Sequence, residues 1–224
     1  MQHSYASPER LILAFLSVCL KDNPILFAVF KSSIPMMLDK RIQILEATAD
    51  LIAERGLHCC PMAKIAKHAK VGAGTIYRYF ETKEVLIQHL HLYICQKLAD
   101  FCTHDYPKQA SIRDRLSHVW GKFYSFMLEN PREQALLDQM WANPALSESA
   151  HQEAMTEINM LTLNLLDEAK KTRAIKSLPN QVLLTYTFGS LFNIATRQQQ
   201  SPALFTEPIE LSSLIELCWD AIKI

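Results

Sequence analysis

Apolar residues along most of the chain recur every three or four positions, which is the period of an α-helix. Between Leu38 and Arg55 they fall on one helical face, at Ile42, Leu45, Ala49 and Ile52. Similar patterns follow at about residues 61–69, 75–80, 82–103, 112–129, 131–143, 148–173, 179–199 and 208–224. No segment alternates clearly between apolar and polar residues, as a half-buried β-strand would. The sequence therefore predicts an all-α fold of about nine helices.

The residues between these segments are typical of helix ends. Gly56 follows the first helix as a stop signal, and Pro61 suits the first turn of the second helix, where its missing N–H costs nothing. A Val-Gly-Ala-Gly break at 71–74 separates the second helix from the third. Thr82 is expected to cap the long helix that follows, because its hydroxyl can accept a hydrogen bond from a first-turn N–H. We place a domain boundary at or just inside the start of that helix.

The first 36 residues have a different character. Two apolar runs, 11–20 and 25–30, are separated by polar residues, and neither approaches the roughly 20 residues that a membrane span needs. No small-residue cleavage site follows them, as a signal peptide would require. Met36 and Met37 stand directly before the first clean helical pattern. We therefore interpret 1–36 as a misassigned start or a loose arm; a packed extra helix and a membrane anchor remain the alternatives.

Composition and charge narrow the class of protein. Of 224 residues, 49% are hydrophobic and 21% are charged, as in an ordinary globular protein, and only five are glycines, which argues against barrels and glycine-rich nucleotide folds. The 23 basic residues balance 23 acidic ones, so the whole chain gives no electrostatic signal for nucleic acid. Residues 56–83, however, hold five lysines or arginines against one glutamate. This local basic segment suits contact with phosphates.

The six cysteines show no metal or disulfide pattern. No CxxC occurs, and the 58–60 His-Cys-Cys triplet with His68 matches no standard zinc spacing. Cys95 and Cys102 lie two helical turns apart, about 10 Å, which is too far for a disulfide. We expect reduced thiols in a cytoplasmic protein, with no metal, cofactor or membrane partner. Sensing by thiols or a metal is the alternative.

The strongest functional signal is a helix–turn–helix pattern at 61–80. Ala66 and Ala69 are small enough for two short helices to cross closely, and Gly72 and Gly74 allow a tight turn between them. In such a module the second helix enters the major groove of DNA and exposes side chains to the bases.

The sequence of residues 65–86, IAKHAKVGAGTIYRYFETKEVL, resembles the DNA-binding segment of the TetR family of bacterial transcriptional regulators. The residues that match the family pattern at identical spacing are Ile65, Ala66, Ala69, Val71, Gly74, Thr75, Tyr77, Phe80, Lys83 and Leu86. The resemblance implies a helix–turn–helix DNA-binding domain at 37–83 and a helical domain at 84–224 that binds an effector and dimerises. It also implies a homodimer that binds a double-stranded DNA operator, and no enzymatic activity.

Carried over residue by residue, the resemblance implies which side chains contact DNA. Those expected to bind phosphates, or in the first case a base, are Thr75, Tyr77, Tyr79 and Lys83. Those expected near base edges are Lys64, Ala73 and Arg78, and an arginine with two bonds to guanine contributes about 1–3 kcal/mol of discrimination. The alternatives are that Arg78 is a solvated surface charge and that Tyr77 belongs partly to the core.

Three positions depart from the family pattern. Cys60-Pro61 stands where a capping Ser or Thr is usual, so a hydroxyl that would touch phosphate is lost. Lys70 replaces the usual glycine of the turn, so either it adopts a positive φ at a cost of about 1 kcal/mol or the turn differs slightly from the family's. Gly72 replaces the usual serine. Lys70 would compensate for the lost hydroxyl with its charge.

The last two predicted helices are candidates for a dimer interface. The 179–199 helix is apolar around nearly its whole circumference, so it must be buried on two sides. Paired with their symmetry mates, the 179–199 and 208–224 helices would form a four-helix interface. The expected interface residues are Tyr186, Gly189, Phe192, Leu214 and Trp219. The alternative is that these residues form a monomer core.

Aromatic and methionine residues on the middle helices suggest an effector pocket for a largely apolar small molecule. The candidates are Trp120, Tyr124, Met127, Met140, Trp141, His151 and Met155. The same stripe is also what an ordinary helical core looks like. We expect a repressor that its effector releases from a palindromic operator. The alternatives are an activator in place of a repressor, a structural or partner-recruiting DNA-binding protein with no effector, and an all-α enzyme, for which the sequence shows no group of catalytic residues.

Overall fold

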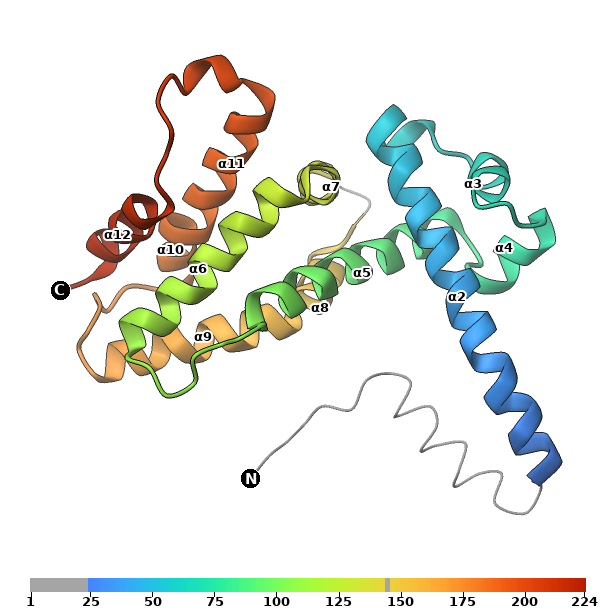
Figure 1. The fold of residues 1–224 in the computed structure, drawn as a ribbon, viewed down its shortest axis with the longest axis horizontal. Helices are drawn as coiled ribbons and strands as arrows, with labels where there is room; N and C mark the ends of the chain where they lie inside the picture. The colour runs from blue at the N-terminus through green and yellow to red at the C-terminus, as the bar shows by residue number, and fades with distance from the viewer. Residues whose placement is uncertain (1–23, 144–145) are drawn as a thin grey trace.

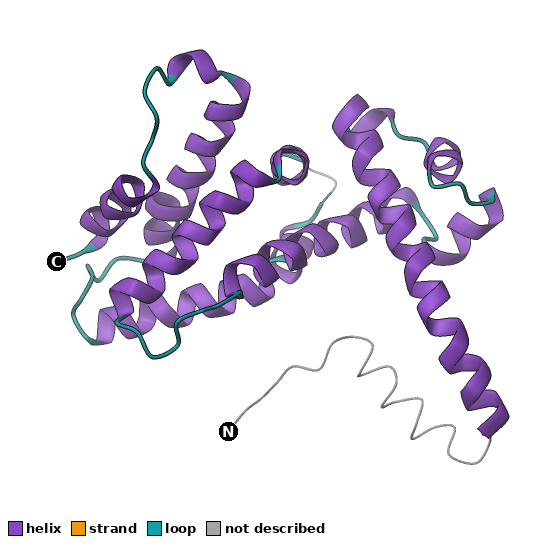
Figure 2. Ribbon diagram, viewed as in Figure 1, coloured by secondary structure: helices purple, strands orange, loops and turns teal. Residues whose placement is uncertain are grey.

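A computed structural model of the chain describes residues 24–143 and 146–224, and it shows two helical lobes joined by one long helix (Figure 1). The described residues form ten helices when the continuous segment 180–200 is counted as one, and they contain no β-strand (Figure 2). Their only strand-like contact is an isolated bridge between Ile175 and Lys223. The all-α prediction is confirmed.

The N-terminal lobe consists of α2 (Pro24–Arg55), a 3-10 turn at Leu57–Cys59, α3 (Met62–His68) and α4 (Ala73–Tyr79). Helix α2 begins at Pro24 and not near Leu38, so residues 24–36 of the predicted extension belong to this helix. Residues 1–23 of that extension lie outside the described part. Ile52, Ile65 and Ile76 are fully buried where α2, α3 and α4 meet.

The connecting helix, α5 (Lys83–Thr103), packs against both lobes. The Thr82 hydroxyl accepts a hydrogen bond from the Val85 N–H at 3.2 Å, which confirms the predicted cap. Phe80, just before the cap, is fully buried, and its ring lies 5.6 Å from that of His89 on α5. The end of the N-terminal lobe is thereby anchored on the long helix.

The C-terminal lobe is built around one central helix, α6, which contacts α5, α7, α9, α11 and α12 (Figure 1). Its elements are α6 (Ile112–Glu129), α7 (Pro131–Trp141), α8 (Glu148–Ala154), α9 (Thr156–Lys171), α10 (Asn180–Leu184), α11 (Ser190–Gln200), a 3-10 turn (Pro202–Leu204) and α12 (Leu211–Ile222). Val119, Trp120 and Met127 of α6 are fully buried.

Two predicted helices differ from the structure in form. The single helix expected at 148–173 breaks at Met155 (φ −92°, ψ 4°), because this break lets α8 pack across α5 while α9 packs along α6. The helix expected at 179–199 is continuous, but a π-helical turn, η2 (Thr185–Gly189), separates α10 from α11. The last helix begins at Leu211, three residues after Pro208.

None of the helices in the described residues combines the length and the apolar composition that crossing a membrane would take.

Candidate nucleic-acid interface

The turn between α3 and α4 is closed by a Schellman motif. The Val71 N–H donates to the Ala66 carbonyl at 2.9 Å, and the Lys70 N–H donates to the Lys67 carbonyl at 3.1 Å. Lys70 occupies the position of this motif that requires the left-handed region, with φ 53°. Of the two alternatives, Lys70 therefore adopts the positive φ, and the turn keeps its geometry without the usual glycine.

Replacing Lys70 by glycine should stabilise the protein and weaken its binding to DNA. Glycine removes the cost of holding a side chain in the left-handed region, so we expect the free energy of unfolding to rise by about 0.5–1 kcal/mol. Loss of the exposed ammonium group removes one candidate phosphate contact. Urea unfolding and a DNA-binding titration measure the two effects. Lys70→Ala is the matched control, since it loses the charge but keeps the strain; a glycine variant no more stable than the alanine variant would contradict the prediction.

The start of α3 lacks a side-chain cap, as the Cys60-Pro61 sequence suggested. Pro61 stands at the N-cap position and makes no side-chain hydrogen bond. The buried thiol of Cys60 instead donates to the Gly56 carbonyl at 3.4 Å, and burial raises the pKa of Cys60. No hydroxyl is available here for a phosphate, so the anchoring falls to other residues.

The outer face of α4 is exposed. Tyr77 is 55% exposed, and Arg78 is exposed, with its guanidinium carbon 5.6 Å from the centre of the Tyr79 ring. Ala73 is exposed at the start of the same helix, and Thr75 is half-buried. A helix with this exposed face has the shape and the donors to lie in a major groove.

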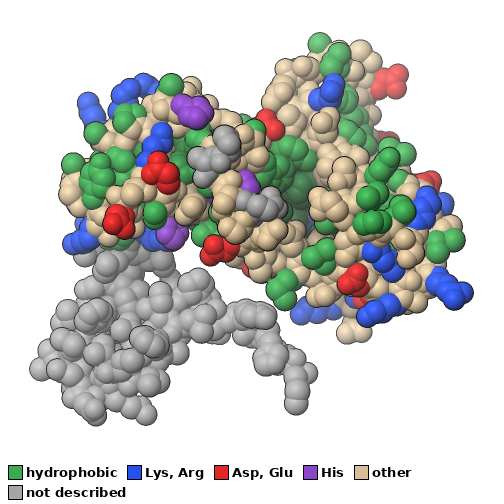
Figure 3. Space-filling view, turned by 180° about the vertical axis from the view of Figure 1, so that it is seen from behind, with side chains coloured by type: hydrophobic (Ala, Val, Ile, Leu, Met, Phe, Trp, Pro, Cys, Tyr) green, Lys and Arg blue, Asp and Glu red, His purple; other side chains and the backbone are tan. Residues whose placement is uncertain are grey.

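Of the eight residues predicted to contact DNA, Tyr79 has its polar group buried and Lys83 is hydrogen-bonded within the protein. The hydroxyl of Tyr79 is buried and has no hydrogen-bond partner in the described residues. The ammonium of Lys83 donates to the Leu57 carbonyl at 2.9 Å and ties the start of α5 to the 3-10 turn. Lys64 and Lys70 are exposed. Lysine and arginine side chains lie along the edges of the N-terminal lobe, on the left in the space-filling view (Figure 3).

The described residues contain no group of three or more His, Cys, Asp or Glu side chains placed to hold a metal ion.

Comparison with protein-family models matches both lobes. Residues 44–90 match the model of bacterial regulatory proteins of the tetR family, and residues 112–223, half of the chain, match the tetracycline repressor-like C-terminal domain. The chain belongs to the TetR family. It is therefore a DNA-binding transcriptional regulator, and the resemblance inferred from residues 65–86 is confirmed.

Individual relatives agree with this assignment. An HTH-type transcriptional regulator of Haemophilus influenzae is 26% identical over 185 residues, which cover 81% of this chain and 94% of that one. A TetR-family regulator from Vibrio parahaemolyticus is 28% identical with a TM-score of 0.71, covering 83% of this chain and 99% of that one.

The fatty acid metabolism regulator of Bacillus subtilis is 31% identical over 128 residues, which cover 57% of this chain and 64% of that one. A structure of FadR from Bacillus subtilis in complex with stearoyl-CoA has the same fold, with 23% identity and a TM-score of 0.67 over 80% of this chain and 95% of that one.

In this TetR-family chain the predicted effector residues lie mostly in the core. The four that are buried are Trp120, Tyr124, Met127 and Met140. The Tyr124 hydroxyl donates to Gln198 of α11. Trp141 is partly exposed and packs on Phe192, with 4.6 Å between ring centres. His151 contacts the ring of His91 edge-on at 5.0 Å, and Met155 lies at the break between α8 and α9.

Two cavities lie near residues discussed above, and none of the predicted effector residues lines either of them. The first, about 110 Å³, lies between the lobes and is lined by Leu57, His58, Lys83, Glu84, Ile87, Asn143 and Leu146. The second, about 220 Å³, is an apolar hollow on the surface of η2, α11 and α12. It is lined by Tyr186, Ser190, Leu191, Ile194, Leu214, Leu217, Cys218 and Ala221.

Of the predicted dimer residues, Tyr186 and Leu214 line the second hollow. Gly189 is exposed on the same π-helical turn. Phe192 faces Trp141 instead, and Trp219 is half-buried with the Arg113 guanidinium 5.8 Å from its ring centre. The hollow is also lined by Leu217, Cys218 and Ala221, which follow Leu214 by three, four and seven residues on one face of α12.

Proposed function

We propose that this TetR-family protein is a cytoplasmic dimeric repressor that binds a palindromic operator through two copies of α4. The observation that carries the proposal is the exposed outer face of α4, with Tyr77 and Arg78 presented beyond a closed Schellman turn. In a helix–turn–helix dimer the two recognition helices enter successive major grooves, about 34–36 Å apart. The symmetry of the protein is then matched by a symmetric DNA site.

The apolar hollow on η2, α11 and α12 supports dimerisation. Tyr186 and Leu217 are large, exposed side chains beside it, and both are more than half exposed in the single chain. Exposed apolar surface of this kind marks a protein interface. In a two-fold dimer the same patch on each protomer forms the interface, so both copies of every side chain in it become buried.

The effector is proposed to bind within the C-terminal lobe and to release the operator. The buried aromatic and methionine side chains of α6 and α7 suit an apolar ligand, and the Bacillus subtilis relative is known in complex with stearoyl-CoA. Because those side chains are packed together here, a ligand enters only by moving them apart. Release further requires that the ligand bind the DNA-free form more tightly than the operator-bound form.

Selection of bound DNA from a random pool tests the proposal. We expect enrichment of a palindrome with half-sites about one helical turn apart. Arg78→Ala should lower affinity for that site about tenfold, since one bidentate contact contributes about 1–3 kcal/mol. Arg113→Ala, which removes an exposed arginine paired with Glu216 in the C-terminal lobe, is the control. Enrichment of no sequence, or equal affinity of both variants, would count against operator recognition by α4.

Titration of the selected complex with stearoyl-CoA, and with coenzyme A as control, then tests release. Equal affinity of stearoyl-CoA for the free and the operator-bound protein would rule it out as the releasing effector.

A further inference from the structure

The N-terminal lobe is held to the rest of the molecule at two places. The chain itself continues from α4 into α5, which extends into the C-terminal lobe (Figure 1). Helix α7, from the C-terminal lobe, also packs directly on α2 and α5. The packing of α2 on α5 holds the N-terminal lobe to the connecting helix, and the contact between α7 and α2 adds a direct tie to the C-terminal lobe that acts on the angle between the two lobes.

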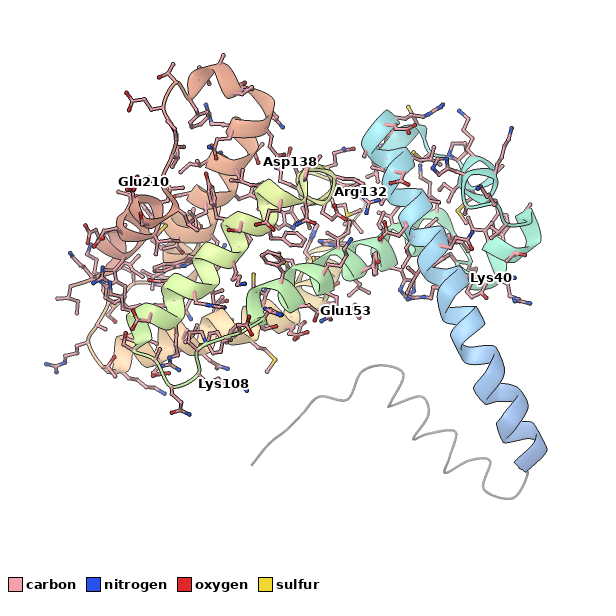
Figure 4. All side chains as sticks on the ribbon, in the orientation of Figure 1. Lys40, Lys108, Arg132, Asp138, Glu153 and Glu210 are labelled. Atoms are coloured by element: carbon pink, nitrogen blue, oxygen red, sulfur yellow. The ribbon has the colours of Figure 1, made fainter. Side chains whose placement is uncertain are left out.

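Arg132, in the first turn of α7, is the centre of that contact (Figure 4). Its Nη1 atom binds Asp50 Oδ1 on α2 at 2.6 Å, and its Nη2 atom binds Glu46 Oε2, one turn earlier on α2, at 2.5 Å. The same Nη2 atom binds the neighbouring Glu133 at 2.7 Å. The planar guanidinium thus spans two turns of α2 at once, and a lysine could not reproduce that geometry.

The partners of Arg132 are themselves tied to α5. Glu46 accepts a hydrogen bond from the Tyr93 hydroxyl at 2.8 Å, and Lys97 donates to Glu133 at 2.6 Å while lying 3.6 Å from Glu46. Helices α2, α5 and α7 therefore meet in one network of alternating charge, and the network contains the only charged contacts between α7 and α2 among the ion pairs of the described residues.

Burial makes this network depend on Arg132. The Glu133 side chain is only 7% exposed. Its burial alone would raise its pKa, yet the hydrogen bonds from Arg132 and Lys97 bring the pKa of Glu133 below its ordinary value. Without Arg132, the carboxylates of Glu46, Asp50 and Glu133 would face one another with Lys97 as their remaining strong partner, and like charges would separate α7 from α2.

A second bond from α7 reaches the 3-10 turn that follows α2. Gln139, seven residues after Arg132 and so about 10 Å further along the helix, accepts a hydrogen bond from the Leu57 N–H at 3.2 Å. Two points this far apart on one helix fix a rotation as well as a distance.

We propose that Arg132 is a positioning residue that sets the orientation of the N-terminal lobe on the C-terminal lobe, and thereby the half-site spacing that the dimer accepts. The proposal rests on the dimeric operator binding proposed above. In a two-fold dimer a rotation of each N-terminal lobe changes the separation of the two α4 helices, so a fixed angle selects one spacing of half-sites.

The test is a selection on DNA in which the enriched half-site occurs twice, with every spacing across about one helical turn represented. The full-length wild-type protein should enrich one spacing. Arg132→Gln should keep the half-site sequence but lose about tenfold of the preference for that spacing over its neighbours, the size of a typical coupling between sites. A purely structural role would instead lower binding at all spacings equally.

Two further variants and one control complete the test. Arg132→Lys keeps the charge without the planar fork and should give an intermediate preference. If the Arg132→Gln protein does not unfold cooperatively, the Gln139→Ala protein replaces it in the test. Gln139→Ala should also broaden the range of half-site spacings that is enriched. Arg115→Gln, an ion-pair loss between α6 and α9, should leave the profile unchanged. A wild-type profile in both the Arg132→Gln and Gln139→Ala proteins would overturn the assignment, whereas a wild-type protein that enriches no paired half-sites would overturn dimeric operator binding and this proposal with it.

Discussion

Replacing Leu217 by glutamate should convert the proposed dimer to monomers and weaken operator binding by about a hundredfold or more. Leu217 is 62% exposed in the single chain and lines the apolar hollow on η2, α11 and α12. In a two-fold interface the substitution buries two carboxylates near apolar surface, which costs several kcal/mol. Monomers bind each half-site independently and lose the gain from linked binding. Sedimentation equilibrium and an operator titration measure the two effects.

Leu204→Glu provides the matched control for this substitution. Leu204 is also a leucine with more than half of its surface exposed, but it belongs to the 3-10 turn after α11 and does not line the hollow. We expect this variant to remain dimeric with unchanged affinity. A Leu217→Glu protein that sediments as a dimer would show that the chain pairs through another surface.

Acid should destabilise the protein through His91 by about 2 kcal/mol between pH 7 and pH 5. His91 is 1% exposed on α5, and neither of its ring nitrogens has a hydrogen-bond partner in the described residues. Burial, with a smaller effect from neighbouring His151, lowers the pKa of His91 from 6.5 to about 4. The unfolded imidazole takes up a proton below pH 6.5 while the folded one stays neutral until about pH 4. Stability is therefore lost as the pH falls through this window.

Urea unfolding of the wild-type and His91→Leu proteins at the two pH values isolates this contribution. The variant should lose about 2 kcal/mol less on acidification, and at pH 7 it should be as stable as the wild type or more so, because it removes two unpaired polar atoms. His89 and His118, whose pKa values burial also lowers, remain and account for a smaller residual loss. His58→Gln, at an exposed position, is the control. Equal acid loss in the wild-type and His91→Leu proteins would contradict the prediction.

The DNA-binding segment could be predicted from sequence because local rules determine it. The Schellman turn depends on residues within six positions of one another, and the positive φ of Lys70 was one of the two alternatives that the family pattern indicated. The break at Met155 could not be predicted in this way. The apolar periodicity continues through Ala154, Met155 and Ile158, and only the packing of α8 across α5 decides where the helix ends.

The candidate site likewise combines features that local sequence determines with features that depend on long-range packing. The sequence shows that Lys83 is a cation at the start of a helix, but not that the Leu57 carbonyl, 26 residues away, accepts a hydrogen bond from it. It likewise gives no sign of the bonds from Arg132 to Asp50 and Glu46, which join residues 82 and 86 positions apart. Residue types indicate what chemistry is available, whereas long-range packing determines which partners remain free for a ligand.

The π-helical turn η2 also fixes the number of residues between α10 and α11. Leu183, Thr187, Leu191 and Ala195 are buried at a constant interval of four, a spacing that drifts around a regular α-helix but stays in phase where a wider turn is inserted. Deleting one residue here would rotate α11 by about 100° relative to α10. That rotation would carry Leu191 out of the core and away from the hollow it lines. A one-residue insertion or deletion within 185–189 should therefore destabilise the fold as a core substitution would, although Thr185, Tyr186 and Gly189 are exposed.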